Sequence, residues 1–361
     1  MHRIPIKVAI ISNTLGSGGA ERFAASLGFI LQNIGCEVHN IVVNDKIDYE
    51  FAGVLFNLEK ESRTKNSVFR KLNKGFLLQH YLIDHHIDTI IDNRSRGIFL
   101  RECFTKWIYG KRNKIFIVHS FHLLSYFPDS VWAARFLYSD AKKIICVSRA
   151  IEKEVQRKYG LQNTETILNS IDLNNLKLDS VVRPNEKYIL YFGRLEEKVK
   201  NFSLMLEAFK ISKIAKLGYK LYIMGDGPDK NWILQQANRL EISNAVQLLP
   251  FESNPFGYVK NAAFTVLTSH YEGFPMSIIE SLAMGTPVVA VDCKSGPSEI
   301  IIDEHNGLLV QNHNMQALSD AFKRLVSDSN LYDICKANAK SSILPLSVDK
   351  IASKWQQILF E

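Results

Sequence analysis

Residues 264–285 read FTVLTSHYEGFPMSIIESLAMG, and their pattern predicts a strand, a loop and a helix in succession. Phe264–Thr268 is apolar and β-branched, as a buried strand would be. Pro275 suits the first position of a helix, and Gly285 suits its end. One apolar stripe along that helix is formed by Ile278, Ile279, Leu282 and Ala283. The segment is therefore typical of one unit of a parallel α/β sheet.

The same alternation of strands and helices runs through the whole chain, which indicates parallel sheets in an α/β fold. The strands predicted in the first half are Lys7–Ser12, Val38–Val43, Asp88–Asp92, Lys114–His119 and Lys143–Ser148. Those predicted in the second half are Tyr188–Phe192, Leu221–Met224, Val246–Leu249, Thr265–Thr268 and Val288–Val291. Helices are predicted over Ala20–Ile34, which stops at Gly35, and over Ser347–Phe360.

A chain of 361 residues exceeds what one hydrophobic core usually supports, so two domains are expected. The polar stretch Ser170–Glu186, which contains Pro184, resembles a linker. We therefore predict a first domain over residues 1–183, completed by a C-terminal helix over 346–361, and a second domain over residues 184–345.

The composition, 46% apolar and 22% charged, is that of a globular protein. No segment approaches about 18 consecutive apolar residues, so we expect a cytoplasmic protein. The five cysteines are scattered and contain no C-x-x-C pair, which favours neither a disulfide framework nor a zinc site.

The excess positive charge lies in the first half of the chain. Residues 1–183 hold 26 Lys and Arg against 18 Asp and Glu, a net charge of +8, whereas the whole chain has +7. Much of this charge lies in residues 60–74, beside Phe69, Leu72 and Phe76. Such a segment could contact an anionic membrane or a lipid diphosphate, or it could be an ordinary solvated helix face. We expect no nucleic-acid partner.

Glu272 and Glu280 are the most informative polar residues. Glu272 lies in the predicted strand-to-helix loop, and Glu280 lies to one side of the apolar stripe, where it could face a crevice. The unpaired N–H groups of the first helical turn, near Met276 and Ser277, favour an anion. Two carboxylates that can bind hydroxyls beside an anion site suit a nucleotide sugar, although helix capping or a surface ion pair is the alternative.

Gly16, Gly18 and Gly19 follow the first predicted strand and open a helix. Their spacing differs from G-x-G-x-x-G, and no acidic residue ends a suitable second strand, so dinucleotide binding is disfavoured. The glycines could let backbone amides approach a diphosphate or an acceptor, or they could form a tight turn.

Taken together, five motifs resemble the retaining glycosyltransferases of family 4, which have the GT-B fold. The first is Glu272 and Glu280 with seven residues between them. The others are Gly18-Gly19-Ala20-Glu21-Arg22, Phe192-Gly193-Arg194-Leu195 with Lys200-Asn201, Met224–Pro228 and Gly296–Ile301. The resemblance implies two Rossmann-like domains that face each other across a cleft, with the C-terminal helix crossing back to the first. It covers residues from about 9 to 310.

The resemblance also implies roles for the donor site. Arg194 and Lys200 would bind the diphosphate, with Lys198 as the rival for the second position. Glu280 would bind the ribose hydroxyls, and Glu272 would position the transferred sugar and stabilise charge rather than act as a nucleophile. The remaining donor-binding residues are expected to be Gly18, Gly19, Gly273, Phe274, Met276 and Ser277.

His119 ends a predicted strand, where related enzymes often carry a functional residue. We expect it to be catalytic, with His122 as the alternative if the register differs, although a lone His at a strand end is often simply structural. Asp226, Glu252, Ser298 and Glu299 are candidates of lower rank.

The predicted function is retaining transfer of a sugar from a UDP- or GDP-activated donor to a hydroxyl of a glycan or a polyprenyl-diphosphate-linked acceptor. The sequence lacks an Asp-x-Asp motif after a strand, so we expect neither a metal nor another cofactor. Two rivals are a nucleotide-sugar epimerase or phosphorylase of the same fold, and a catalytically silent nucleotide-sugar-binding scaffold.

Overall fold

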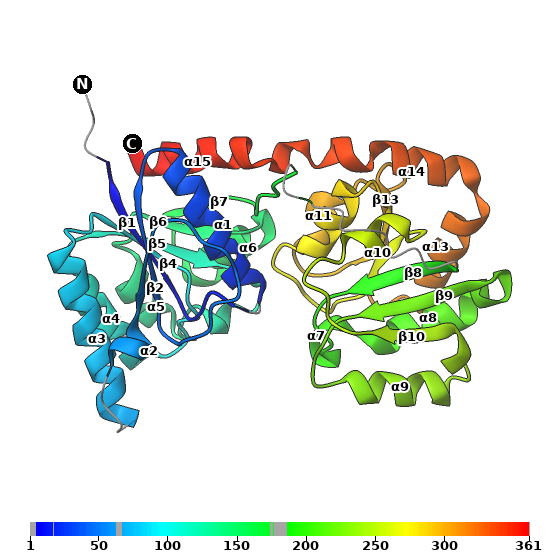
Figure 1. The fold of residues 1–361 in the computed structure, drawn as a ribbon, viewed down its shortest axis with the longest axis horizontal. Coiled ribbons are helices and arrows are strands. Elements are labelled where there is room, and N and C mark those ends of the chain that lie inside the picture. The colour runs from blue at the N-terminus through cyan, green and yellow to red at the C-terminus, as the bar shows by residue number, and fades with distance from the viewer. Residues whose placement is uncertain (1–4, 17, 63–66, 174–175, 177–185, 361) are drawn as a thin grey trace. The chain divides into compact units, whose positions relative to one another are not determined.

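The computed structural model describes residues 5–16, 18–62, 67–173, 176 and 186–360. It consists of two compact units (Figure 1). Unit 1 combines Met1–Asn169 with Val348–Glu361, and unit 2 spans Ser170–Ser347. The predicted domain boundary at residue 183 lies outside the described residues.

In the described part of the chain, unit 1 is built on a parallel seven-stranded sheet with the order β3-β2-β1-β4-β5-β6-β7. Its strands are β1 (Lys7–Ser12), β2 (Glu37–Val42), β3 (Val54–Asn57), β4 (Thr89–Asp92), β5 (Asn113–Val118), β6 (Lys143–Cys146) and β7 (Thr164–Thr166). The central strands are buried along most of their length, which is expected when helices cover both faces of a parallel sheet.

The helices of unit 1 pack around this sheet. They are α1 (Gly19–Asn33), α2 (Leu58–Glu61), α3 (Ser67–Asp84), α4 (Phe99–Tyr109), α5 (Val131–Tyr138), α6 (Arg149–Tyr159) and α15 (Val348–Phe360), with a short 3₁₀ turn at Leu123–Ser125. Helices α3, α4, α5 and α6 pack in succession, and α15 packs on α1 (Figure 1). The C-terminal helix thus belongs to unit 1, as the resemblance implied.

Unit 2 is built on a parallel six-stranded sheet, in the described residues, with the order β10-β9-β8-β11-β12-β13. Its strands are β8 (Lys187–Phe192), β9 (Tyr219–Met224), β10 (Val246–Leu249), β11 (Thr265–Leu267), β12 (Val288–Asp292) and β13 (Gly307–Gln311). Its helices are α7 (Glu197–Lys200), α8 (Phe202–Ser212), α9 (Lys230–Arg239), α10 (Phe256–Asn261), α11 (Met276–Ala283), α12 (Pro297–Ile300), α13 (Met315–Ser327) and α14 (Ser329–Ser342). Short 3₁₀ turns occupy Ile214–Leu217, Ser243–Ala245 and Leu344–Leu346.

The predicted α/β class and the two Rossmann-like sheets are confirmed, and all ten predicted strands are present. Strands β3, β7 and β13 were not predicted. Helix α11 begins at Met276, so Pro275 is its N-cap and not its first residue.

Each sheet has a switch point, where chain order reverses between neighbouring strands. It lies between β1 and β4 in unit 1 and between β8 and β11 in unit 2. Ligands of open parallel sheets bind beyond the carboxyl ends of the strands at such points. The loops after these four strands, and after β5 beside β4, therefore decide where a site can form.

Candidate functional site

Two glycines bring the loops after β8 and β9 into direct backbone contact. Gly193 donates its N–H to the carbonyl of Met224 at 3.0 Å. A Cβ atom on Gly225, whose φ is +149°, would lie only 1.9 Å from the carbonyl oxygen of Gly193. The strings Phe192–Leu195 and Met224–Pro228 thus form one closely packed edge, and this close approach is what requires glycine.

Glu272 is held beside Lys200 at the switch point of unit 2. Lys200 Nζ donates to Glu272 Oε1 at 2.7 Å, and Ser269 Oγ donates to the same oxygen at 2.6 Å. Both charged side chains are mostly buried, with 19% of Lys200 and 12% of Glu272 exposed. The second oxygen, Glu272 Oε2, accepts no hydrogen bond from the described residues, which suits a group that binds a ligand hydroxyl.

Backbone contacts fix this pair. Lys200 ends α7, which follows β8, and its carbonyl accepts a hydrogen bond from Thr268 Oγ1 at 2.8 Å. Glu272 N donates to the carbonyl of Lys294 at 3.1 Å. Burial acts to lower the pKa of Lys200, but the Glu272 carboxylate and Tyr191 outweigh it, so the pKa lies above its ordinary value.

Arg194 and Lys200, predicted to bind one diphosphate together, make different ion pairs. Arg194 is 70% exposed, and its Nε lies 3.1 Å from Glu196 Oε2. Tyr191 orients the Arg194 segment, because its hydroxyl donates to the carbonyl of Arg194 at 2.8 Å. Lys198, the rival of Lys200, is exposed, and it is Lys200 that lies beside Glu272.

Glu280 is buried in α11, only 5% exposed. The start of this helix is half-buried at Met276 and Ser277, whereas Gly273 and Phe274 are buried. Ser295 Oγ donates to the carbonyl of Gly273 at 2.7 Å. A Cβ on Gly296, at φ +99°, would lie 2.4 Å from Pro275 Cδ. The loop after β12 therefore supports the loop that carries Glu272.

In unit 1, the strand ends of β1, β4 and β5 meet at Asn93. Asn93 Nδ2 donates to the carbonyl of Ala20 at 2.9 Å and to Ser12 Oγ at 3.4 Å. Its Oδ1 lies 2.6 Å from His119 Nε2. Because Oδ1 can only accept, the proton of a neutral His119 lies on Nε2 and leaves Nδ1 as an acceptor.

His119 is kept neutral by its surroundings. Burial and the Arg96 guanidinium lower the pKa of His119 to about 3. The ring packs edge-on against Phe23 of α1, with 4.9 Å between the ring centroids. Gly18 and Gly19 open that helix, and Gly18 N donates to Tyr49 Oη at 3.3 Å. His119 is thus connected to the glycine loop.

Two family models together cover most of the chain. Residues 174–342 match the glycosyl transferases group 1, and residues 17–175 match glycosyltransferase family 4. Over 371 aligned residues the chain is 31% identical to the N-acetylgalactosamine-N,N'-diacetylbacillosaminyl-diphospho-undecaprenol 4-alpha-N-acetylgalactosaminyltransferase of Campylobacter jejuni, covering 96% of this chain and 97% of that protein. The chain belongs to glycosyltransferase family 4.

Other relatives agree with this assignment. The lipopolysaccharide 1,6-galactosyltransferase of Salmonella typhimurium is 25% identical over 84% of this glycosyltransferase and 85% of its own length. The fold matches that of the Anabaena protein HepE in complex with UDP, with a TM-score of 0.78 at 17% identity over 98% of this chain and 100% of that one. The GT-B fold predicted from the motifs is confirmed.

Sequence reasoning missed three residues of this glycosyltransferase that orient the predicted ones. Ser269 binds Glu272, Tyr191 binds the carbonyl of Arg194, and Asn93 binds His119. Ser269 and Asn93 directly follow predicted strands, a position that could have identified them. Tyr191 is one of two tyrosines in an otherwise apolar strand, Tyr188–Phe192.

A buried ionic network, also missed from the sequence, supports the strand end beside His119. Arg94 Nη2 lies 2.6 Å from Asp92 Oδ2, which also accepts from Tyr109 Oη at 2.8 Å. Arg96 donates to the backbone carbonyls of Asp92, Arg94 and Ile117. The cluster fixes the loop after β4. In the sequence, the charged residues of Asp92–Arg96 are the pattern that could have indicated it.

Of the candidates of lower rank, Asp226 lies at the packed edge of the loops after β8 and β9, where its carbonyl accepts a hydrogen bond from Leu195 N at 2.9 Å. Asp226, Glu252 and Ser298 are exposed, and Glu299 is half-buried in the first turn of α12. Among the described residues, no group of three or more His, Cys, Asp or Glu side chains could hold a metal ion, and no helix is long and apolar enough to cross a membrane.

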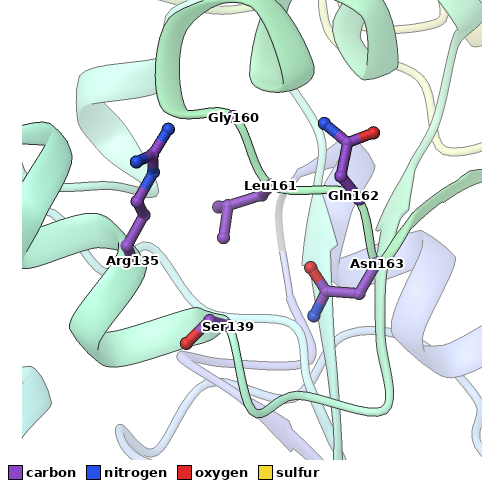
Figure 2. A pocket seen from close by; sticks show the side chains of 6 residues that line it. All are labelled: Arg135, Ser139, Gly160, Leu161, Gln162 and Asn163. Atoms are coloured by element: carbon purple, nitrogen blue, oxygen red, sulfur yellow. The ribbon is translucent and has the colours of Figure 1, made fainter.

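A cavity of about 650 Å³ lies away from all the predicted site residues. Figure 2 shows its lining, formed by Arg135, Ser139, Gly160, Leu161, Gln162 and Asn163. The Arg135 side chain points toward Gly160, and its Nε donates to the carbonyl of Tyr159 at 2.7 Å. This hollow between the ends of α5 and α6 holds none of the residues expected to carry the chemistry.

Proposed function

We propose that this glycosyltransferase transfers a sugar, with retention of its anomeric configuration, from a nucleoside-diphosphate donor to a hydroxyl of a lipid-linked or polysaccharide acceptor. The observation that carries the donor half is the Lys200–Glu272 pair at the switch point of unit 2. It places a cation and a carboxylate with a free oxygen where ligands of parallel sheets bind.

Among the donor-binding residues, the cations Lys200 and Arg194 bind the diphosphate. Lys200 Nζ has further donors beside the one that binds Glu272, and Arg194 is 70% exposed, so both can bind a diphosphate. Negative charge develops on that leaving group as the glycosidic bond breaks, and fixed cations stabilise it more in the transition state than before it. These two side chains can thus act without a metal.

The carboxylates bind the hydroxyl groups of the donor. We assign Glu280 to the ribose hydroxyls and Glu272 Oε2 to a hydroxyl of the transferred sugar. Glu272 acts as a positioning and charge-stabilising group, because Lys200 and Ser269 already bind Oε1 and leave Oε2 for the sugar.

In unit 1 we assign His119 to the substrate. A neutral imidazole with its proton fixed on Nε2 can accept a hydrogen bond from a hydroxyl through Nδ1. The names of the relatives support the acceptor class, since the Campylobacter enzyme is named for a diphospho-undecaprenol acceptor and the Salmonella enzyme for lipopolysaccharide. A structure of the HepE relative contains UDP, which favours a UDP-sugar donor over a GDP-sugar.

The first experiment is a thermal-shift screen of UDP, GDP and their common sugar conjugates. A ligand at 100 times its Kd adds about 2.7 kcal/mol of stability. A shift with one nucleotide family supports the donor site, and proton NMR of the product made with a polyprenyl-diphosphate glycan tests retention. Release of sugar 1-phosphate or an epimerised donor would favour the rival enzymes, and donor binding without turnover would favour a silent scaffold.

A further inference from the structure

An unusually apolar surface covers three neighbouring helices of unit 1. Leu100, Trp107 and Trp132 are 79%, 56% and 70% exposed. We call the following set the aromatic face, which spans α3, α4 and α5: Phe69, Leu72, Phe76, Phe99, Leu100, Phe104, Trp107, Trp132 and Phe136. Monomeric proteins rarely expose large contiguous apolar patches, and a large patch marks an interaction surface.

Helical periodicity gathers these residues on one side. Residues 69, 72 and 76 form one stripe of α3, residues 100, 104 and 107 form one stripe of α4, and residues 132 and 136 are one turn apart on α5. Helix α3 packs beside α4, and α4 packs beside α5. The stripes therefore lie on adjacent helices.

Ring contacts join the stripes. Phe76 packs edge-on against Phe104 and Trp107, with centroid distances of 6.0 and 6.3 Å. Phe99 lies 6.3 Å from Trp132 and 6.4 Å from Phe136. These contacts form two ring clusters, one between α3 and α4 and one between α4 and α5, and α4 carries residues of both.

Most of the described cations in residues 60–74, the basic segment of unit 1, are paired with carboxylates of the same chain. Lys60 lies 3.3 Å from Asp45, Arg70 lies 3.2 Å from Glu59, and Lys74 is buried against Glu59. Those cations are largely neutralised within the chain, and residues 63–66 lie outside the described part. Lys60, Arg70 and Lys74 are thus three of the four described cations of that segment, and Lys71 is the fourth.

Other cations border the aromatic face. Among the described residues, the exposed Lys71 on α3 and Lys111 after α4 form no ion pair with a carboxylate. Helices α3, α4 and α5 contain only two acidic residues, Asp84 and Glu102, and Glu102 is buried. Exposed aromatic rings with bordering cations match the interfacial region of an anionic bilayer.

We propose that the aromatic face docks onto an anionic lipid bilayer, with Trp107 and Trp132 at the level of the headgroups. Indole suits this depth because it combines a large apolar ring with one N–H donor. The carboxylates that flank α5, Asp129 and Asp140, are exposed but paired with lysines of the chain. Rings with unpaired lysines beside them fit an anionic bilayer better than a protein partner or a second copy of the chain.

Sedimentation with vesicles tests the proposal without any sugar substrate, so its outcome is independent of the proposed transfer reaction. We expect the protein to bind equimolar phosphatidylglycerol and phosphatidylcholine vesicles more tightly than phosphatidylcholine alone. The triple variant Leu100→Ser, Trp107→Ser and Trp132→Ser should lower the partition coefficient roughly tenfold or more.

The matched control removes three similarly exposed apolar side chains from unit 2: Leu217→Ser, Phe251→Ser and Ile302→Ser. It should bind vesicles as the wild type does, and thermal melts should show both triple variants folded. The Lys71→Gln and Lys111→Gln double variant should weaken binding to anionic vesicles at low salt more than at high salt.

Brominated lipids then locate the contact. Vesicles with bromine in the acyl chains should quench tryptophan fluorescence of the wild type and of Trp232→Phe, but much less that of the Trp107→Phe and Trp132→Phe double variant. No vesicle binding, equal losses in the two triple variants, quenching that survives the double variant, or a dimer in light scattering that only the first triple variant abolishes would each overturn the proposal.

Discussion

Lys200 Nζ lies 2.7 Å from Glu272 Oε1, although the two residues are separated by three strands along the chain. Lys200 follows β8 and Glu272 follows β11, and these strands are neighbours in the sheet. The ion pair therefore depends on the switch point of unit 2, and the same contact joins two motifs that are far apart in the sequence.

The first prediction concerns this pair. Lys200→Met or Glu272→Gln leaves its partner mostly buried without a counter-charge, so each should lower the free energy of unfolding by roughly 2 kcal/mol. The double variant should cost less than the sum, giving a coupling energy of about 1 kcal/mol in urea titrations. Since the pKa of Lys200 is raised, the stabilisation should be constant up to about pH 10 and decline above it.

If the losses of unfolding free energy in Lys200→Met and Glu272→Gln simply add up in the double variant, the pair contributes no coupling energy. Both single variants should also lose sugar transfer while remaining folded at 25 °C. A Glu272→Gln enzyme with unchanged kcat would remove Glu272 from the proposed site.

The second prediction separates Arg194 from Lys198. Both side chains are exposed, so Arg194→Ala and Lys198→Ala should each change the free energy of unfolding by less than about 0.5 kcal/mol. Only Arg194→Ala should remove most of the thermal shift caused by the nucleoside diphosphate, because we assign Arg194 to that group. An equal loss in Lys198→Ala would make Lys198 a diphosphate ligand as well.

Much of this architecture could be predicted because its signals are local. Runs such as Lys7–Ser12 and Val246–Leu249 are apolar enough to indicate buried strands, and both were predicted at their observed bounds. Strand β7 (Thr164–Thr166) is short and polar, so its pairing with β6 comes from tertiary contacts that no local pattern reveals.

In the candidate site, too, features with a local sequence pattern could be predicted and features set by tertiary contacts could not. Glycines and charged residues at strand ends indicated where ligands would bind, and the Glu272–Glu280 spacing identified the family. The ion-pair partner of each group could not be predicted, since Lys200 could have paired with Glu196 or Glu197 nearby and instead pairs with Glu272 across the sheet. The Asp92–Arg94 network was missed because the charged string Asp92–Arg96 becomes significant only once its side chains are known to be buried.

The third prediction tests the close approach of two loops. In Gly225→Ala the new methyl group would collide with the Gly193 carbonyl at 1.9 Å, at a φ of +149° that alanine rarely adopts. We expect a loss of roughly 3 kcal/mol or more in the free energy of unfolding. The control is Gly218→Ala, also at positive φ but with no atom within 4 Å of the new Cβ, which should cost about 1 kcal/mol. Equal losses of unfolding free energy in Gly225→Ala and Gly218→Ala would show that the close approach of the Gly193 carbonyl does not add to the destabilisation.

The last prediction uses the pKa of His119, about 3 in the folded protein against an ordinary value of about 6.5. Because the folded state disfavours the protonated imidazole, protonation stabilises the unfolded chain as the pH falls below 6.5. Between pH 7 and pH 5 this group alone should remove about 2 kcal/mol from the free energy of unfolding, and the loss should be complete near pH 3. In His119→Asn the amide cannot titrate, so its stability should fall by about 2 kcal/mol less over that interval in urea titrations at fixed temperature. A His119→Asn protein whose stability falls as steeply as that of the wild type would show that His119 titrates normally in the folded state.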